Sequence, residues 1–288
     1  MKKRTRLFSI ALLLALLTFH LIASLPAPAE PLAALPEGTA VVLTTGGARG
    51  DQDVYDALAA RKAQLTAGGH PVITVDAGDA LAPSDGEAVG RMNAASYDLA
   101  VPGRLEWSGG YDAFLDLRET VKFPYVSANV KSTKTRDILL PSTKAFQAGA
   151  LKIAFVGVTT PGIAAESPGS FLDNSGYPRC TFSPEALDAT VQSAVDSARG
   201  KGADVVVLLG YLDAEGPWSA QELIVRSRGL DAAIVATQAV PGAVGSCVDV
   251  DGRSVICLQP SAGSIGALIV ATDGSIRAEM LPVETSGN

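Results

Sequence analysis

The sequence predicts an α/β layered fold, and three observations carry that prediction. Short runs rich in Val and Ile alternate with segments of helical periodicity along the chain of 288 residues. The Val/Ile-rich runs are continuously apolar, which is typical of strands that are covered on both faces. Hydrophobic residues make up 47% of the chain, enough for a large buried core. We therefore expect a single domain in which helices cover sheets.

The predicted elements follow one another from residue 40 onward. Strands are expected at residues 40–45, 72–77, 99–101, 153–158, 205–209 and 232–236. Helices are expected at residues 53–67, 86–95, 111–120, 184–198 and 220–227. The helix at 184–198 has the clearest boundary signals, with Ser183 as N-cap, Pro184 in the first helical position and Gly200 just past its end.

The C-terminal part predicts an antiparallel meander. Strand-like runs flank Asp251-Gly252, and a second pair flanks Asp273-Gly274, both of which are hairpin turn signals. Cys247 and Cys257 lie at nearly equal distances from the first turn. We expect them to face each other across a three-residue loop, where they could close as a disulfide.

A third cysteine, Cys180, has no expected partner. It is read first as a small buried residue. The alternative is a reactive thiol, because the neighbouring Arg179 would favour the thiolate.

The N-terminus predicts an export signal. Residues 1–6 are basic, residues 7–25 carry no charge, and Ala27-Pro28-Ala29 offers a cleavage site. The expected organisation is a leader at 1–29, a Pro/Ala-rich linker at 30–39 and a domain at 40–285, with a periplasmic or extracellular location. The alternative is an uncleaved membrane anchor through residues 7–25, since this segment has about the length that spans a bilayer.

Charge and histidine content exclude several classes of function. Without the leader the chain holds 19 basic and 30 acidic residues, a net charge of −11. Such a surface repels phosphate backbones, so nucleic acid is not an expected partner. His20 lies in the leader, which leaves His70 alone in the mature protein. Sites built on several imidazoles are therefore excluded.

A glycine-rich turn, TGGARG at residues 45–50, follows the first predicted strand. Such a turn can hold phosphates on backbone N–H groups, and it resembles the turn of short-chain dehydrogenases. Gln52 stands where that pattern has its last glycine, and the Gly-Lys-Ser/Thr ending of a phosphate-binding loop is missing. A tight strand-to-helix turn is favoured, and no cofactor is expected.

The order of several segments carries a family resemblance. These segments are VLTTGGARG at 42–50, VDAGD at 75–79, and residues 92–106, 123–130 and 152–161. In this order they resemble the 5′-nucleotidase branch of the calcineurin-like metallophosphoesterases. The resemblance implies a four-layer α/β/β/α sandwich and, in active members, phosphoester hydrolysis at two divalent metal ions.

The resemblance also implies which positions would hold the metals. Only one of them keeps a ligand side chain, so the metal site is expected to be degenerate. The positions are Gly47, Arg49, Asp79, Arg104, Leu105, Tyr211, Thr237 and Ala239. Two divalent ions need several carboxylate and imidazole ligands, and Asp79 alone cannot supply them. If any divalent metal binds, Asp79 is its ligand.

The two arginines at these positions suggest two outcomes. Arg49 and Arg104 could pair with Asp79 and fill the site with an ion pair. Alternatively, they could bind phosphate or another anion together with the backbone N–H groups at residues 46–48, which are Gly46, Gly47 and Ala48.

The function expected from these observations is a non-catalytic binding or scaffold protein of the cell envelope. Its partner would be phosphate, a nucleotide or another envelope protein. The first alternative is a phosphoester hydrolase with an altered site around Asp79. The second alternative is a thiol-dependent redox protein that uses Cys180.

Overall fold

The computed structural model describes residues 35–135, 138–183, 186–238 and 241–283. A five-stranded sheet has the order β13 (Ile276–Leu281), β12 (Ile265–Val270), β1 (Ala40–Thr45), β2 (Val72–Asp76) and β3 (Leu99–Ala100). A six-stranded sheet has the order β10 (Ala243–Val248), β11 (Ser254–Gln259), β9 (Ala232–Ala236), β8 (Val205–Tyr211), β6 (Leu151–Thr159) and β5 (Thr143–Ala148). The short strands β4 (Lys131–Ser132) and β7 (Cys180–Thr181) pair separately.

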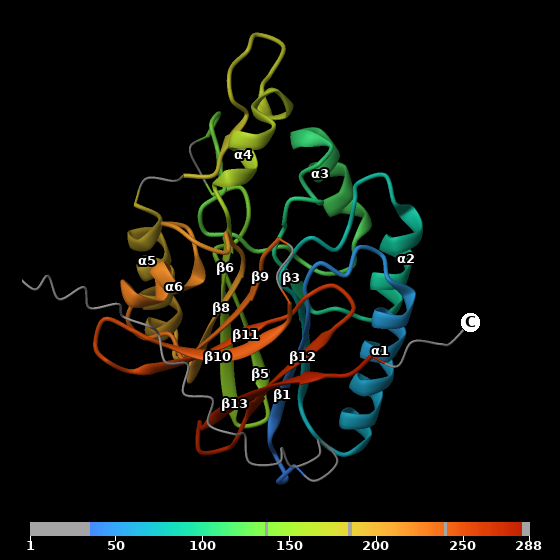
Figure 1. Ribbon diagram of the computed structural model, residues 1–288, viewed down its shortest axis with the longest axis vertical. Helices are drawn as coiled ribbons and strands as arrows, with labels where there is room; N and C mark the ends of the chain where they lie inside the picture. The colour runs from blue at the N-terminus through green and yellow to red at the C-terminus, as the bar shows by residue number, and fades with distance from the viewer. Residues whose placement is uncertain (1–34, 136–137, 184–185, 239–240, 284–288) are drawn as a thin grey trace, which may run out of the picture. The chain divides into compact units, whose positions relative to one another are not determined.

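The helices lie on the outer faces of the two sheets (Figure 1). On one side are α1 (Gln52–Ala67) and α2 (Gly86–Ala94), and on the other are α5 (Leu187–Gly200) and α6 (Ala220–Val225). The helix α3 (Gly110–Thr120), the short helix α4 (Gly162–Glu166) and the 3₁₀ helix η2 (Pro168–Phe171) gather at one end of the sheets.

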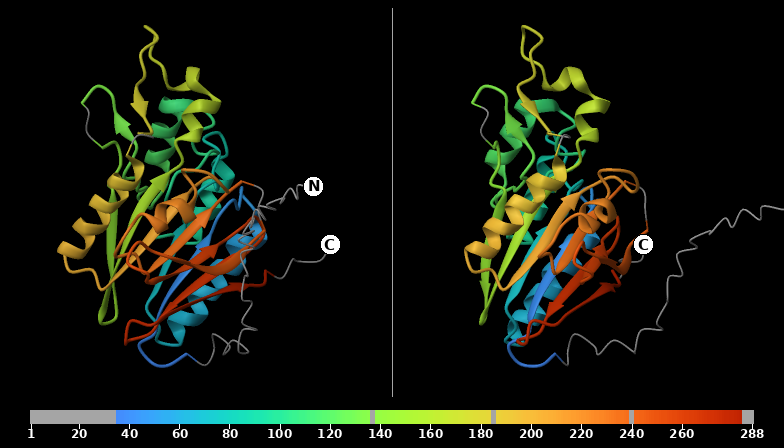
Figure 2. Two further views of the ribbon diagram at one scale, coloured as in Figure 1. Left: turned by 60° about the vertical axis from the view of Figure 1, so that its left-hand side comes forward. Right: turned by 90° about the vertical axis from the view of Figure 1, so that its left-hand side faces the viewer.

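Figure 2 shows the layers from two further sides. Two apolar cores connect them. The larger core lies between the sheets and under α1, and it includes Leu43, Phe155 and Leu268. The second core joins α5 to the six-stranded sheet through residues such as Val191 and Leu208. Both faces of the central strands are therefore covered, which explains their continuous apolar runs. The predicted four-layer arrangement is confirmed.

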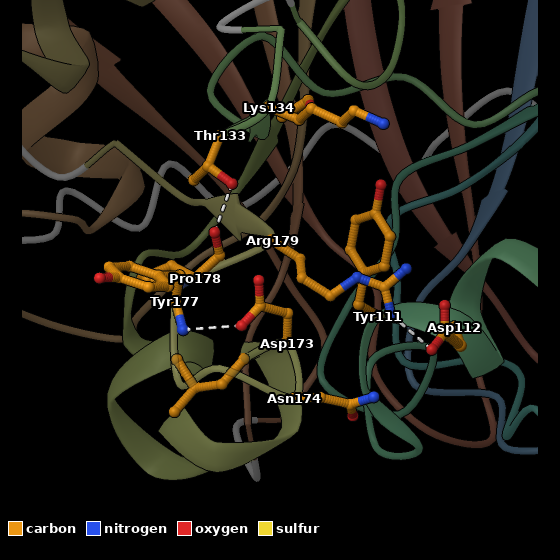
Figure 3. Close-up of a pocket in the computed structure, with 11 residues that line it drawn as sticks. Tyr111, Asp112, Thr133, Lys134, Asp173, Asn174, Tyr177, Pro178 and Arg179 are labelled. Carbon is orange, nitrogen blue, oxygen red and sulfur yellow. Dashed lines mark hydrogen bonds and ion pairs between the residues drawn. The ribbon is translucent and has the colours of Figure 1, made fainter.

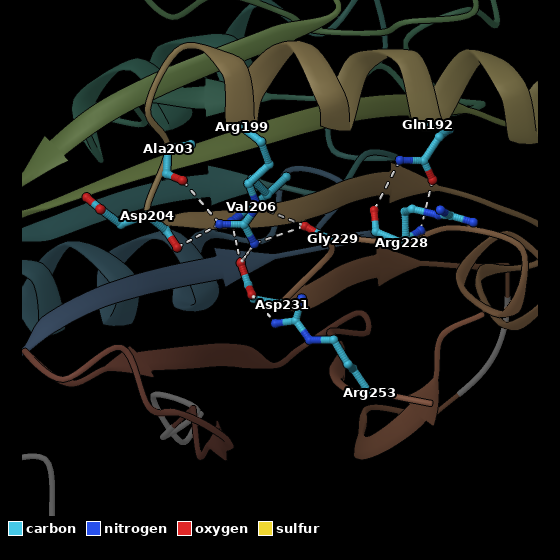
Figure 4. Close-up of polar contacts among 9 residues, drawn as sticks. All are labelled: Gln192, Arg199, Ala203, Asp204, Val206, Arg228, Gly229, Asp231 and Arg253. Carbon is cyan, nitrogen blue, oxygen red and sulfur yellow. Dashed lines mark hydrogen bonds and ion pairs between the residues drawn. The ribbon is translucent and has the colours of Figure 1, made fainter. Parts of the chain in front are cut away.

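A polar network on the surface fixes α5 to the loops of its sheet (Figure 4). Arg199 donates to the Gly229 carbonyl oxygen at 3.0 Å and pairs with the Asp231 carboxylate. About two turns earlier, the Gln192 amide accepts from the Arg228 N–H at 2.8 Å and donates to the Arg228 carbonyl oxygen at 3.2 Å. These contacts set the position of the helix along the sheet, beyond what its apolar face determines.

The start of α5 differs from the sequence prediction. The helix begins at Leu187, and Ala186 precedes it in the left-handed region with φ 57°. Ser183 is therefore not its N-cap, and Pro184 lies outside the described residues. The physical reason is that Phe182 is buried in the larger core and Leu187 in the second one. Ala186 in the left-handed region cannot be part of the helix, so the helix begins at Leu187.

The predicted C-terminal meander is also corrected. Its two hairpins belong to different sheets, because β11 pairs with β9 in parallel whereas β12 pairs with β1 antiparallel. Turn signals specify the partner within each hairpin and carry no information about the sheet that it joins. The strand β5 was not predicted, because most of its side chains are exposed or half-buried and its sequence, TKAFQA, lacks a long apolar run.

The predicted leader, residues 1–29, and much of the linker lie outside the described residues. Within the described part, no helix is long and apolar enough to cross a membrane.

Candidate functional site

The candidate site lies where the carboxyl ends of strands from both sheets meet. In the first sheet β1, β2 and β3 run parallel, so the loops that follow them emerge at the same edge. In the second sheet β8 and β9 run parallel and end opposite each other at Tyr211 and Ala236. The two edges approach closely, since a Cβ on Gly46 would lie 2.7 Å from the Cβ of Ala236.

Glu106 organises the backbone of this site. Its carboxylate accepts four backbone N–H groups, from Asp79 at 3.0 Å and from Ala80, Leu81 and Gly103 at 2.8 Å each. The side chain is buried, and burial raises the pKa of Glu106 to about 7. One carboxylate therefore holds the loop after β2 against the loop after β3.

Asp79 is paired with Arg49. The Arg49 guanidinium donates to Asp79 Oδ2 at 2.7 Å, and the backbone N–H of Leu105 donates to Oδ1 at 2.8 Å. The Asp79 side chain is 4% exposed and that of Arg49 is 57% exposed. The pairing predicted from the sequence is present for Arg49, which covers the carboxylate from the solvent side.

Arg104 does not join this pair. Its guanidinium forms an ion pair with Glu166 at the end of α4, rather than with Asp79. The prediction that both arginines pair with Asp79 was therefore wrong for Arg104. The Arg104 side chain is 27% exposed and that of Glu166 is 47% exposed, and their ion pair ties α4 to the loop after β3.

Tyr211 fills the space between the loops. A Cβ on Gly78 would lie 2.9 Å from the Cβ of Tyr211, and one on Gly103 would lie 3.0 Å from its Cδ2. Both glycines therefore leave room for the tyrosine. Burial raises the pKa of Tyr211, whose ring is 1% exposed. The phenol is thus neutral at ordinary pH and acts as packing.

The predicted anion cradle is only partly available. The backbone N–H of Gly47 is donated to the Gly78 carbonyl oxygen at 2.8 Å, so it cannot bind a ligand without breaking that bond. Thr237 lies half-buried after β9, and its hydroxyl accepts from the Gln259 amide at 3.2 Å. Ala239 lies outside the described residues.

A second buried carboxylate, Asp76, was not singled out from the sequence. It accepts from the Thr45 hydroxyl at 2.5 Å and from the backbone N–H of Gly78 at 2.7 Å. Complete burial, and then the nearby Glu106, raise the pKa of Asp76 well above its usual range. Its place in the VDAGD segment, three residues before Asp79, was the available signal.

These residues do not fit a divalent metal ion. A guanidinium bonded to Asp79 places a positive charge where a cation would have to bind. Asp76 and Glu106 are committed to backbone N–H groups. Over the described ranges, no group of three or more His, Cys, Asp and Glu side chains is arranged to hold a metal.

Solved structures show which proteins share this architecture. The sulfate thiohydrolase SoxB from Thermus thermophilus matches at 22% identity and a TM-score of 0.68, over 80% of this chain and 42% of its own. The calcineurin-like phosphoesterase YfkN from Bacillus subtilis matches at 18% identity and a TM-score of 0.65, over 86% and 92%. The fold is that of the calcineurin-like phosphoesterases.

Another match is a 5′-nucleotidase precursor from Thermus thermophilus, at 18% identity and a TM-score of 0.68, over 85% of this chain and 54% of its own. The chain thus spans about half the length of SoxB and of this 5′-nucleotidase. The sequence matches no family model and no curated protein.

Beside the site, the calcineurin-like fold carries a cleft of about 880 Å³ (Figure 3). It lies between the start of α3, the turn after β4 and the loop at residues 172–179. The Arg179 guanidinium stacks on the Tyr111 ring at 4.3 Å and pairs with Asp112 at 2.5 Å. Lys134 and Tyr177 are exposed at its rim. This cleft was not predicted from the sequence, because three segments distant in the chain build it.

The reactive-thiol interpretation of Cys180 is overturned. Its side chain is 3% exposed, and burial raises the pKa of Cys180 to about 12, although Arg179 lowers it slightly. The thiol is therefore protonated and shielded, as a small packing residue would be. The buried thiol also argues against the alternative of a redox protein that uses Cys180.

The prediction that Cys247 and Cys257 lie directly opposite each other was wrong. Cys247 pairs with Val255 and Cys257 with Gly245, so the two cysteines occupy diagonal positions of the hairpin. Their sulfur atoms lie 3.4 Å apart and are not bonded to each other. The register is set by Asp249, which pairs with Arg253 and thereby places the loop one residue earlier than expected.

Proposed function

We propose that the chain is a non-catalytic relative of the 5′-nucleotidases, exported to the cell envelope as a binding or scaffold protein. The observation that carries the proposal is the ion pair between Arg49 and Asp79. Hydrolysis by two divalent ions requires both cations to be held and a water between them to be activated. Here the Arg49 guanidinium takes the place of a metal ion beside Asp79, and it offers neither an open coordination position nor a bound water.

The surroundings of Asp79 support the same proposal. Leu105 and Tyr211 stand at positions where the family resemblance implies imidazoles, and neither side chain can ligate a divalent metal as a neutral imidazole does. Glu106 nevertheless keeps the loops in place. The backbone frame of the fold is retained, while the side chains that would do the chemistry are replaced.

A metal analysis combined with a phosphatase assay tests this proposal against the alternative of a hydrolase with an altered site. The mature protein is loaded with Mn²⁺, Zn²⁺ or Mg²⁺, freed of excess metal and assayed on p-nitrophenyl phosphate and nucleotides. We expect no stoichiometric metal and no turnover above that of the Asp79→Asn variant. Bound metal at one or two equivalents, with turnover that Asp79→Asn abolishes, would establish the hydrolase instead.

The cleft supports a binding function, because its volume lies in the range of small-molecule sites. The exposed Tyr177 ring can stack on a base, and the Lys134 ammonium can meet a phosphate. Arg49 and Arg104, in contrast, are already paired with carboxylates. A nucleotide in the cleft is therefore favoured over inorganic phosphate at the two arginines.

Calorimetry separates these two locations. The protein is titrated with a nucleoside monophosphate and with inorganic phosphate, using Lys134→Ala for the cleft and Arg49→Ala with Arg104→Ala for the arginine pair. We expect heat with the nucleotide, lost in Lys134→Ala and retained in the arginine variants. Heat with phosphate that only the arginine variants lose would move the site to Asp79. No heat at millimolar ligand would leave the scaffold function.

A further inference from the structure

The two cysteines of the edge hairpin form a close sulfur pair. Cys257 Sγ lies 3.4 Å from Cys247 Sγ and is oriented to donate its S–H to it. A disulfide bond is about 2.05 Å long, so the sulfurs need to approach by only about 1.4 Å. Rotation of two side chains and a small shift of β10, the last strand of its sheet, can supply that approach.

A cavity gives reagents access to both sulfurs. Its volume is about 210 Å³, and both cysteines line it together with Ala220 and Gln221 from α6 and Gln259 from β11. Cys247 and Cys257 are half-buried, in contrast to the buried Cys180. Among the three thiols, these two can therefore meet a small solute.

The pair is chemically asymmetric. The hydrogen bond from Cys257 lowers the pKa of Cys247 to about 7. The same hydrogen bond, followed by burial, raises the pKa of Cys257. Cys247 is thus the thiolate that attacks first, and Cys257 is the thiol that closes the ring after its neighbour has reacted.

We propose that Cys247 and Cys257 are a reversible dithiol–disulfide pair that exchanges with low-molecular-weight disulfides of the glutathione type. The Cys247 thiolate attacks one sulfur of the small disulfide, forms a mixed disulfide and expels one small thiolate, which takes up the proton that Cys247 released. Cys257 then gives up its proton, and its sulfur attacks the Cys247 sulfur and expels the second small thiol. Two protein thiols are oxidised, and one small disulfide is reduced to two thiols.

The expected structural effect is local. The bond would join two adjacent strands at diagonal positions and close a loop of eleven residues, from Cys247 to Cys257. It would tie the outermost strand β10 to β11 through the side of the hairpin that faces α6. Closing such a loop raises the melting temperature of a domain of this size by about 5 °C. The chemistry needs neither a metal nor Asp79.

Thiol counting tests the proposal. The mature protein is reduced, freed of reductant, incubated with oxidised glutathione, unfolded and alkylated, and then analysed by mass spectrometry. We expect one alkylated cysteine, Cys180, no attached glutathione, and a mass lower by two hydrogen atoms before alkylation. Dithiothreitol should restore three alkylated cysteines. Three alkylated cysteines after oxidation, or glutathione retained on both Cys247 and Cys257, would overturn the proposal.

Single variants test the order of attack. Cys257→Ser should stop at the mixed disulfide, with one glutathione on Cys247, and should show no rise in melting temperature on oxidation. Cys247→Ser should react with oxidised glutathione at least about tenfold more slowly than Cys257→Ser does. Cys180→Ser is the matched control and should behave as the unaltered protein does. Equal rates in the two hairpin variants would contradict the assignment of Cys247 as the attacking thiol.

Discussion

The two halves of the candidate site are held in different ways. On the side of the five-stranded sheet, Asp76, Asp79 and Glu106 accept eight hydrogen bonds or ion pairs between them, and most come from backbone N–H groups. On the side of the six-stranded sheet, Tyr211 packs against glycines and Thr237 accepts one side-chain hydrogen bond.

The difference shows which residues of the candidate site are tied to the backbone of the fold. Asp79 and Glu106 match the family segments, and both also bond to the backbone of neighbouring loops. Leu105, Tyr211 and Thr237 stand where the resemblance implies imidazoles, and no hydrogen bond joins their side chains to the backbone of a neighbouring loop in the described part of the chain. Side chains that hold the backbone are costly to replace, because their loss leaves buried N–H groups without an acceptor.

The largest loss of stability is expected when Glu106 is removed. Glu106→Ala leaves four buried N–H groups without an acceptor, so we expect the free energy of unfolding to fall by about 4 kcal/mol. Urea unfolding followed by circular dichroism measures it. Glu87→Ala, at a side chain that is 80% exposed, is the control and should change stability by less than about 0.5 kcal/mol. A loss below about 1 kcal/mol at Glu106 would remove the basis of the comparison.

The pH dependence gives the next largest effect. Burial raises the pKa of Glu106 to about 7, so between pH 4.5 and 7 the folded state keeps a proton that the unfolded state has released. The stabilisation is complete below about pH 4.5 and is lost as the pH rises through 7. The stability of the unaltered protein relative to Glu106→Gln, which does not titrate, should therefore fall by about 3 kcal/mol over that range. A difference that is independent of pH would show that Glu106 is ionised throughout.

Removal of Arg49 should have a smaller effect, because its side chain is 57% exposed and solvent screens the pair. Arg49→Ala leaves the Asp79 carboxylate with the Leu105 N–H as its remaining partner, and we expect a loss of about 1 kcal/mol. Arg226→Ala is a matched control, since its side chain is 51% exposed and also pairs with a carboxylate. The stability of both variants is measured by thermal unfolding. Equal losses of stability would show that the Arg49 pair is an ordinary surface contact.

The smallest effect is expected on the other side of the site. Thr237→Ala removes one half-buried hydrogen bond to Gln259, and we expect a change within about 0.5 kcal/mol. A loss above about 1.5 kcal/mol, measured by the same urea unfolding, would show that this half of the site is as tightly held as the first.

The layers of the fold could be predicted from the sequence, because the periodicity of apolar residues reflects which faces are buried. Strands β1 and β9 begin and end at the predicted residues, since their apolar runs coincide with complete burial. The partner of Arg104 could not be predicted, because Glu166 ends a five-residue helix that leaves no periodic signal. The offset of Cys247 from Cys257 was equally hidden, since it depends on how Asp249 bonds within its own loop.

A degenerate metal site was predicted from the residues at the family positions, and the geometry adds how the space around Asp79 is used. Arg49 meets Asp79, but the Gly47 N–H turns to Gly78 and is lost to a ligand. Such choices depend on backbone angles at residues in the left-handed region, such as Arg49 with φ 50° and Asp79 with φ 65°. Residue type alone does not specify them.

The backbone clamp of Glu106 has a consequence for how the protein is made. The loops after β2 and β3 are fastened by a carboxylate that the chain carries itself, so no ion has to arrive before they take their final form. Refolding should proceed equally well in the presence of a strong chelator. We therefore expect the protein to mature independently of the metal supply of its compartment.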